Sequence, residues 1–250
     1  MKKMSKKLKI FLISLLCFVI VCCSAFGIYV SDYYRANDTA LAATFSDDTV
    51  TVIQKNDDYM VFTPEKPKCG FVFYPGGKVE YTAYAPLMKA LAEEGIFCVL
   101  VKMPFNLAVF DINAADDIFE EYTNIKEWYV GGHSLGGSMA ASYASKNTDK
   151  LEGLILLAAY STENLTDSGL DVIQITARED EILWDDMEEV KKYQPNLPDD
   201  FKQLCIEGGC HAYFGSYGEQ KGDGKPTITP EEQVRQTVEF ISATLFGGEN

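Results

Sequence analysis

From residue 49 onward, the chain alternates between short, continuous apolar runs and segments with apolar residues at helical spacing. The apolar runs cover residues 70–74, 96–101, 128–131, 151–158, 172–176 and 201–206. The segments with helical spacing cover residues 84–94, 114–122, 135–145 and 231–245. Continuous apolar strands that alternate with helices are typical of a parallel sheet covered on both faces. We therefore predict an α/β fold built on a mostly parallel sheet.

Two further short runs precede this alternation, at residues 49–54 and 59–62. They are separated by the turn-forming sequence Asn56-Asp57-Asp58, so we predict a β-hairpin there. Parallel sheets carry their chemistry on the loops at the carboxyl ends of the strands. Functional side chains are therefore expected directly after the apolar runs.

The N-terminal region has a different pattern. Residues 10–30 contain no charged side chain and are long enough to cross a bilayer as a helix. Five lysines precede this segment, so the positive-inside rule places the N-terminus in the cytoplasm and the rest of the chain outside. We predict a basic cytoplasmic segment at 1–9, a transmembrane signal anchor at 10–30, a stalk at 31–48 and one catalytic domain at 49–250.

Two other interpretations of residues 10–30 stay open. One is a cleaved signal peptide, because Ala25-Phe26-Gly27 resembles a cleavage site and would be cut before Ile28. The other is a buried core helix. The anchor and the signal peptide both export the domain: the anchor keeps it on the membrane as a single-pass protein, and cleavage releases it as a secreted protein.

Composition and charge exclude several classes of protein. The chain has 22 basic and 37 acidic residues, a net charge of −15 and a pI near 4.5. Nucleic-acid binding needs a basic surface, so nucleic acid is not an expected partner. The apolar content of 47% excludes a disordered chain. With only two histidines, a histidine-rich metal site is not expected either.

The cysteines of the exported part permit two interpretations. Cys69, Cys98, Cys205 and Cys210 are an even number on the oxidising side of the membrane, so disulfides are possible. The pairs would be Cys205 with Cys210, and Cys69 with Cys98. The other interpretation is four buried thiols. No C-x-x-C spacing supports a zinc site.

The strongest chemical signal is the G-x-S-x-G pattern at Gly132-His133-Ser134-Leu135-Gly136. An apolar run precedes it and a helical segment follows it, which is the context of a nucleophile elbow. A turn this tight requires neighbouring positions that are nearly free of side chains. It holds the Ser134 hydroxyl at a helix N-terminus, where developing negative charge is favoured. The alternative is a purely structural glycine turn.

A serine nucleophile needs a base and an acid that orients the base. His133 lies in the elbow itself and is expected to point away from the hydroxyl, so His211, after the last apolar run, is the predicted base. The acid is expected between serine and histidine in the chain and directly after a strand. Asp180 fits that position, and Glu179 and Glu181 are the alternative acids. The interpretation without a catalytic role is a solvated acidic turn.

An oxyanion intermediate needs backbone N–H donors. Leu135, directly after the serine, is expected to supply one. The second is expected from the loop after Tyr74, from either Gly77 or Lys78.

These motifs resemble the α/β-hydrolase superfamily, and within it the bacterial α/β-hydrolase-fold-5 group, over about residues 45–248. The more specific segments are FYPGGKVEYTAYAPL (73–87), VKMPFNLAVF (101–110) and HAYFGSYGEQKGDG (211–224). The resemblance implies that Ser134, Asp180 and His211 form a catalytic triad. One departure is Cys210, where the family pattern has asparagine before the histidine.

The resemblance also bears on the substrate site. Residues 160–170 leave no room for a lid domain, so we expect an open site. Side chains on two loops are candidates to wall an acyl pocket: Phe105, Asn106, Tyr213, Phe214 and Tyr217.

We therefore expect an exported, membrane-anchored serine hydrolase that cleaves small-molecule or lipid-like carboxylic esters without metal or cofactor. The alternatives are an acyltransferase, an amidase or a thioesterase that uses the same triad, and a surface binding protein with an inactive site.

Overall fold

The computed structural model describes residues 5–182 and 188–247. The chain divides into two compact units, Met1–Tyr33 and Tyr34–Asn250. The first unit contains helix α1 (Lys6–Ser31), which is capped by Ser5, whose side chain accepts the N–H of Leu8. Within the described residues, α1 alone is long and apolar enough to cross a membrane, with a mean hydropathy of 2.7. The expected N-terminal apolar helix is thus present.

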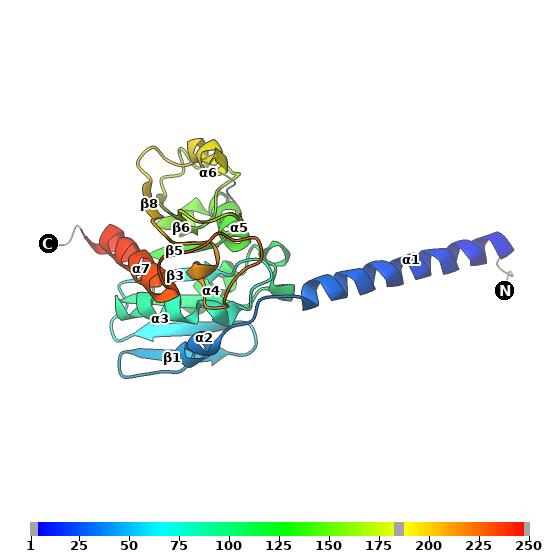
Figure 1. The fold of residues 1–250 in the computed structure, drawn as a ribbon, viewed down its shortest axis with the longest axis horizontal. Coiled ribbons are helices and arrows are strands. Elements are labelled where there is room, and N and C mark those ends of the chain that lie inside the picture. Colours follow the sequence, from blue (N-terminus) through cyan, green and yellow to red (C-terminus); the bar gives the residue numbers. More distant parts are fainter. Residues whose placement is uncertain (1–4, 183–187, 248–250) are drawn as a thin grey trace. The chain divides into compact units, whose positions relative to one another are not determined.

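The second unit is built on one eight-stranded sheet with strand order β1-β2-β4-β3-β5-β6-β7-β8 (Figure 1). The strands are β1 (Val50–Lys55), β2 (Tyr59–Pro64), β3 (Cys69–Tyr74), β4 (Ile96–Val101), β5 (Trp128–His133), β6 (Gly153–Leu157), β7 (Asp171–Ala177) and β8 (Lys202–Ile206). Strand β2 pairs antiparallel with both β1 and β4, and the pairs from β4 to β8 are parallel. The predicted hairpin and the mostly parallel sheet are confirmed.

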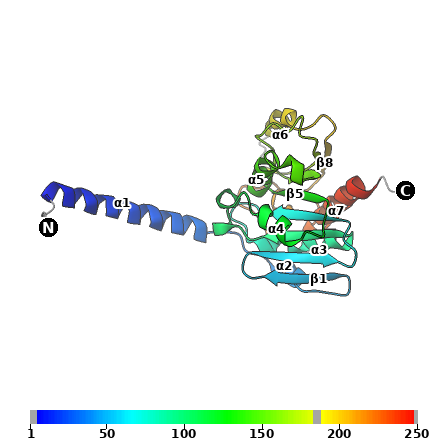
Figure 2. The same cartoon turned by 180° about the vertical axis from the view of Figure 1, so that it is seen from behind.

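Helices cover both faces of this sheet. The helices of the unit are α2 (Asp38–Ala43), α3 (Ala85–Glu93), α4 (Ala115–Glu121), α5 (Leu135–Ala144), α6 (Glu188–Tyr193) and α7 (Pro230–Phe246). Helices α3 and α7 pack on one face, and α4 and α5 pack on the other (Figures 1 and 2).

Side chains of each central strand alternate between the two cores. In β3, Phe71 and Phe73 face the core under α3 and α7, whereas Val72 and Tyr74 face the core under α4 and α5. Strand β3 is buried along its whole length, which explains its continuous apolar sequence. The carboxyl ends of the parallel strands consequently meet at one edge of a rigid sheet.

The structure differs from the sequence-based expectations around two segments. Residues 34–48, expected to be a stalk, belong to the compact unit from Tyr34 onward. They include α2, where Ala40 is fully buried and the Asn37 side chain caps the helix. Between β7 and β8 lies helix α6, which was not predicted. Residues 160–170, which are predicted to leave no room for a lid domain, contain no helix or strand.

The cysteines form no disulfide within the described residues. All seven are free, and Cys69, Cys98 and Cys210 are buried while Cys205 is half-buried. Cys69 and Cys98 do lie on neighbouring strands, β3 and β4. The disulfide interpretation is therefore wrong for this structure, and the buried-thiol interpretation describes three of the four cysteines.

Candidate active site

Ser134 occupies a sharp turn between β5 and α5. Its backbone has φ 52° and ψ −123°, an unfavourable conformation for any residue with a side chain. Two backbone hydrogen bonds hold the turn: the Ser134 N–H donates to Leu157, and the Ser134 carbonyl accepts the N–H of Ser138. Ser134 is thereby fixed at the N-terminus of α5.

The two glycines of the G-x-S-x-G pattern are required by close backbone contacts. A Cβ atom at Gly132 would lie 2.3 Å from the carbonyl oxygen of Tyr74, and one at Gly136 would lie 2.1 Å from the same oxygen. Neither position can hold a side chain without moving the end of β3. The structure thus supplies the physical reason for the pattern from which the elbow was predicted.

Backbone strain gathers at this edge of the sheet. Five non-glycine residues with left-handed φ values of 43–59° lie there, one or two after each of four consecutive strands: Lys78, Phe105, Asn106, Ser134 and Ala158. The remaining left-handed non-glycine residue, Asn56, lies in the β1–β2 turn. Such conformations cost of order 1–3 kcal/mol each and cluster at functional sites. This distribution marks the edge as the candidate site.

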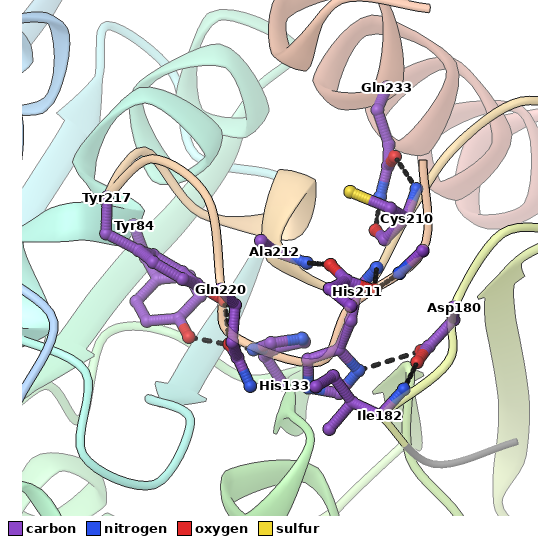
Figure 3. Close-up of polar contacts among 12 residues, drawn as sticks. Tyr84, His133, Asp180, Ile182, Cys210, His211, Ala212, Tyr217, Gln220 and Gln233 are labelled. Carbon is purple, nitrogen blue, oxygen red and sulfur yellow. Dashed lines mark hydrogen bonds and ion pairs between the residues drawn. The ribbon is translucent and has the colours of Figure 1, made fainter. Parts of the chain in front are cut away.

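Asp180 and His211 are in direct contact at the same edge (Figure 3). Oδ2 of Asp180 lies 2.7 Å from Nδ1 of His211, and both side chains are almost completely buried. Asp180 follows β7 and His211 follows β8, its neighbour in the sheet. The other carboxylate oxygen, Oδ1, accepts the N–H of Ile182 at 3.0 Å. This geometry holds the proton of the imidazole on Nδ1 and leaves Nε2 as the basic nitrogen.

Asp180 is distinguished from its neighbours by burial. Glu181 is exposed and Glu179 is half-buried, whereas Asp180 is 2% exposed. Among the three predicted acids, Asp180 makes the contact with His211.

His133 has a different environment from His211. Its Nδ1 lies 2.8 Å from the hydroxyl of Tyr84, and its ring centroid lies 4.4 Å from that of His211. Within the described part of the chain, its Nε2 is buried without a hydrogen-bond partner. Burial lowers the pKa of His133 well below its usual value, so this imidazole stays neutral. His133 therefore packs beside the predicted base as an uncharged group.

The loop after β3 presents one free amide. The N–H of Gly76 donates to the Tyr84 hydroxyl at 3.1 Å, and that of Lys78 donates to the carbonyl of Asn106 at 2.8 Å. Across the described residues, the N–H of Gly77 has no protein acceptor. A Cβ atom at Gly77 would lie 2.9 Å from Cδ2 of Leu135, so these two residues are adjacent. Leu135 is the first residue of α5, and its N–H has no acceptor within the helix.

Three of the five pocket candidates are at least partly accessible. Phe105 is 54% exposed and lies edge-on to Phe110, with 5.5 Å between the ring centroids. Asn106 and Tyr213 are half-buried.

The other two pocket candidates lie inside the protein. Phe214 is 1% exposed and its ring lies 5.7 Å from that of His133. Tyr217 is 7% exposed and packs against Tyr84, with 6.4 Å between centroids. Their position is that of residues that support the site from within the core.

Sequence reasoning missed Tyr84, whose hydroxyl contacts both the loop after β3 and the elbow. No local signal marks it, because a tyrosine at an apolar helical position is indistinguishable from an ordinary core residue. In the part of the chain that is described, no group of three or more His, Cys, Asp or Glu side chains is arranged to hold a metal ion.

Comparisons with known proteins bear on the family and the fold. The sequence profile of the "Alpha/beta hydrolase family" matches residues 70–235. A search of curated proteins gives no significant sequence match.

Three solved structures illustrate the likeness in fold. Carboxyl esterase 2 from Tuber melanosporum is 12% identical, with a TM-score of 0.55, covering 85% of this chain and 90% of its own. Monoacylglycerol lipase from Paleococcus ferrophilus is 15% identical, with a TM-score of 0.56, covering 74% and 98%. A predicted CIB-like hydrolase from Thermoplasma acidophilum is 15% identical, with a TM-score of 0.55, covering 78% and 97%.

Proposed function

Because this chain belongs to the alpha/beta hydrolase family, we propose that it is an esterase that cleaves carboxylic esters through an acyl-enzyme on Ser134. The observation that carries the proposal is the 2.7 Å contact between Asp180 and His211 at the edge of the sheet that also holds the strained Ser134 turn. Two of the structural neighbours are an esterase and a lipase, which supports ester substrates.

In the first step, Nε2 of His211 takes the proton of the Ser134 hydroxyl while Oγ attacks the ester carbonyl. Asp180 stabilises the resulting imidazolium through its contact with Nδ1. The carbonyl oxygen becomes an oxyanion, and the N–H groups of Gly77 and Leu135 donate to it. Gly77 is preferred to Lys78 as the donor, because the Lys78 N–H is already bound to Asn106.

The tetrahedral intermediate then collapses. The bond from the carbonyl carbon to the alkoxy oxygen breaks, and His211 returns its proton to the departing alcohol. His211 next takes a proton from water, whose oxygen attacks the acyl-enzyme. The second collapse releases the carboxylic acid and restores the Ser134 hydroxyl. The residues account for every proton in this cycle, so no metal or cofactor is invoked.

Phe105, Asn106 and Tyr213 are proposed to contact the substrate beside the reacting carbonyl. The exposed Phe105 ring offers an apolar surface for an acyl chain. A panel of nitrophenyl esters of graded chain length, compared between wild type and Phe105→Ala, measures this contribution. The variant is expected to lose rate on the longer esters and to keep its rate on the acetate.

Helix α1 is proposed to anchor the chain in a membrane with residues after 30 outside. Its apolar length and the lysines before it support this arrangement. The test is to express the full gene and to determine the N-terminus and the cell fraction of the mature protein. An intact N-terminus on protein in the membrane fraction supports the anchor. A soluble product that begins at Ile28 would instead identify a cleaved signal peptide.

Labelling with a fluorophosphonate probe tests the nucleophile. Full-length wild type in detergent is expected to react covalently at Ser134, and Ser134→Ala is expected not to react. Ser145→Ala, at the far end of α5, is the matched control and keeps wild-type labelling. Retained labelling in Ser134→Ala, or an unreactive wild type, would overturn the proposal.

A further inference from the structure

The predicted base lies on a loop with little regular structure. His211 belongs to residues 207–229, which join β8 to α7 and contain one short 3-10 turn, Ala212–Phe214. A side chain that accepts and returns a proton must be held within about 0.5 Å of its productive position. The contacts that hold the backbone of this loop are therefore functionally relevant.

Asp223 binds the backbone at the base itself. Oδ1 accepts the N–H of His211 at 3.2 Å, and Oδ2 accepts the N–H of Ala212 at 2.8 Å. Oδ1 also accepts the N–H of Gly224 at 2.9 Å. The first N–H groups of a helical turn have no acceptor within the turn, so the carboxylate caps it in the way that an N-cap residue caps a helix.

Gln233 binds the preceding residue from α7 (Figure 3). Its Oε1 accepts the N–H of Cys210 at 3.0 Å, and its Nε2 donates to the carbonyl of Cys210 at 2.9 Å. Gln233 is fully buried. A Cβ atom at Gly209 would lie 2.4 Å from Oε1, so glycine at 209 makes this approach possible. The amide thereby satisfies both backbone groups of one residue.

We propose that Asp223 and Gln233 form a polar clamp on residues 210–212 that positions the imidazole of His211 against Asp180. The inference rests on the proposed function, since His211 is the base only in that mechanism. The clamp restrains the backbone of His211, and Asp180 restrains its ring at Nδ1. Both clamp residues are positioning residues, because they act on His211 through hydrogen bonds to backbone groups of residues 210–212 and 224.

Asp223 is the more informative residue to change. It is half-buried and borders a cavity of about 490 Å³ that is also lined by Tyr213, Glu219 and Lys225. Water from this cavity can solvate the backbone N–H groups that Asp223→Ala leaves behind, so the variant is expected to fold. Asp223→Asn keeps one carbonyl oxygen, which can accept one of the two N–H groups of His211 and Ala212.

The experiment compares these two variants with wild type and with Glu219→Gln, an exposed acid of the same loop. For Asp223→Ala on nitrophenyl acetate, kcat is expected to fall between about 10-fold and about 100-fold, with KM within about twofold of wild type. The kcat of Asp223→Asn is expected to lie between those of wild type and Asp223→Ala, and the kcat of Glu219→Gln is expected to match that of wild type. The rate of fluorophosphonate labelling should fall in parallel with kcat.

A measurement independent of turnover complements the kinetics. The Nδ1–H proton of His211 is expected to give a downfield ¹H NMR signal in wild type, because it is held against the Asp180 carboxylate. Asp223→Ala should broaden this signal, and Gln233→Met should do the same.

Two outcomes overturn the clamp: a kcat for Asp223→Ala within twofold of wild type, or an unchanged Nδ1–H signal in both variants. An active wild type with an equally active Asp223→Ala would leave the esterase proposal standing. An inactive, unlabelled wild type would instead refute the esterase proposal.

Discussion

The Tyr84 hydroxyl lies 2.8 Å from Nδ1 of His133 and accepts the N–H of Gly76 at 3.1 Å. Both side chains are essentially fully buried. Burial raises the pKa of Tyr84, so the phenol keeps its proton, and that proton is available for Nδ1. One hydroxyl therefore joins the loop after β3 to the nucleophile turn, two segments that are far apart in sequence.

Tyr84→Phe tests this link. The change leaves two buried groups, the Gly76 N–H and His133 Nδ1, without a partner, at about 1–3 kcal/mol for each unsatisfied group. We expect a lower free energy of unfolding in urea and a lower kcat at a temperature where the variant is folded. Tyr81→Phe is the control, because its hydroxyl binds the Gln54 side chain at an exposed position. If Tyr84→Phe and Tyr81→Phe lowered the free energy of unfolding and kcat equally, the result would contradict the link.

Substitutions at Asn106 test whether its left-handed backbone conformation helps to position the amides of the loop after β3. At φ 55°, its carbonyl reaches the N–H of Lys78, which orients the adjacent Gly77. Glycine adopts this conformation readily and a β-branched residue does not. Both changes remove the side-chain amide, so the difference between them isolates the backbone: we expect the kcat of Asn106→Val to be about tenfold or more below that of Asn106→Gly. The measurement is the kcat of each variant. Similar values would show that the Asn106 carbonyl does not position the loop.

We predict that the stability of the protein depends on pH through His133. The folded state holds the imidazole neutral, whereas the unfolded state takes up a proton below about pH 6.5. Because the unfolded state then binds more protons, stability is lost as pH falls, by up to about 1.4 kcal/mol per pH unit for one such group. Urea unfolding at pH 7.5 and pH 5 measures this loss. His133→Gln, which can still accept from Tyr84, should lose less stability; an equal loss would contradict the interpretation.

We predict that the cysteine thiols differ in their reactivity. Burial raises the pKa of the Cys69 and Cys210 thiols to about 12, and that of Cys98 well above its usual value. At pH 8 a thiol of pKa 12 is about 0.01% thiolate, which is the reactive form. In native protein treated with iodoacetamide, peptide mapping should show Cys205 modified well before these three. Modification of Cys210 as fast as Cys205 would show that the loop opens.

The sequence predicts the strands of the sheet well and predicts helix α6 and residues 34–43 poorly, for a physical reason. Strand β4 (Ile96–Val101) matches its apolar run at both ends, because a strand buried on both faces must be apolar throughout. Helix α6 has the sequence EEVKKY, in which no apolar stripe marks a helix. Residues 34–43 are held by tertiary contacts, such as the Ala36 N–H on Glu80, which leave no local pattern.

The same division applies to the candidate site. Ser134, Asp180 and His211 could be predicted as a triad because each follows a predicted strand and their order in the chain is informative. Gly77 and Lys78 were not separable, because backbone amides look alike in a sequence and only the partner at Asn106 distinguishes them. Tyr84, Asp223 and Gln233 make contacts with residues that are distant in the sequence, which no spacing rule reveals.

The left-handed residues after β3, β4, β5 and β6 also bear on attempts to engineer a heat-resistant form of the protein. Replacing Lys78 or Phe105 by glycine relieves backbone strain and is an obvious choice for raising the melting temperature. In the proposed mechanism, the same exchanges loosen the amides that face the oxyanion. Gains in heat tolerance from these two exchanges should therefore come with slower turnover, whereas strands β1 and β2, at the end of the strand order, offer positions where the two properties can be improved independently.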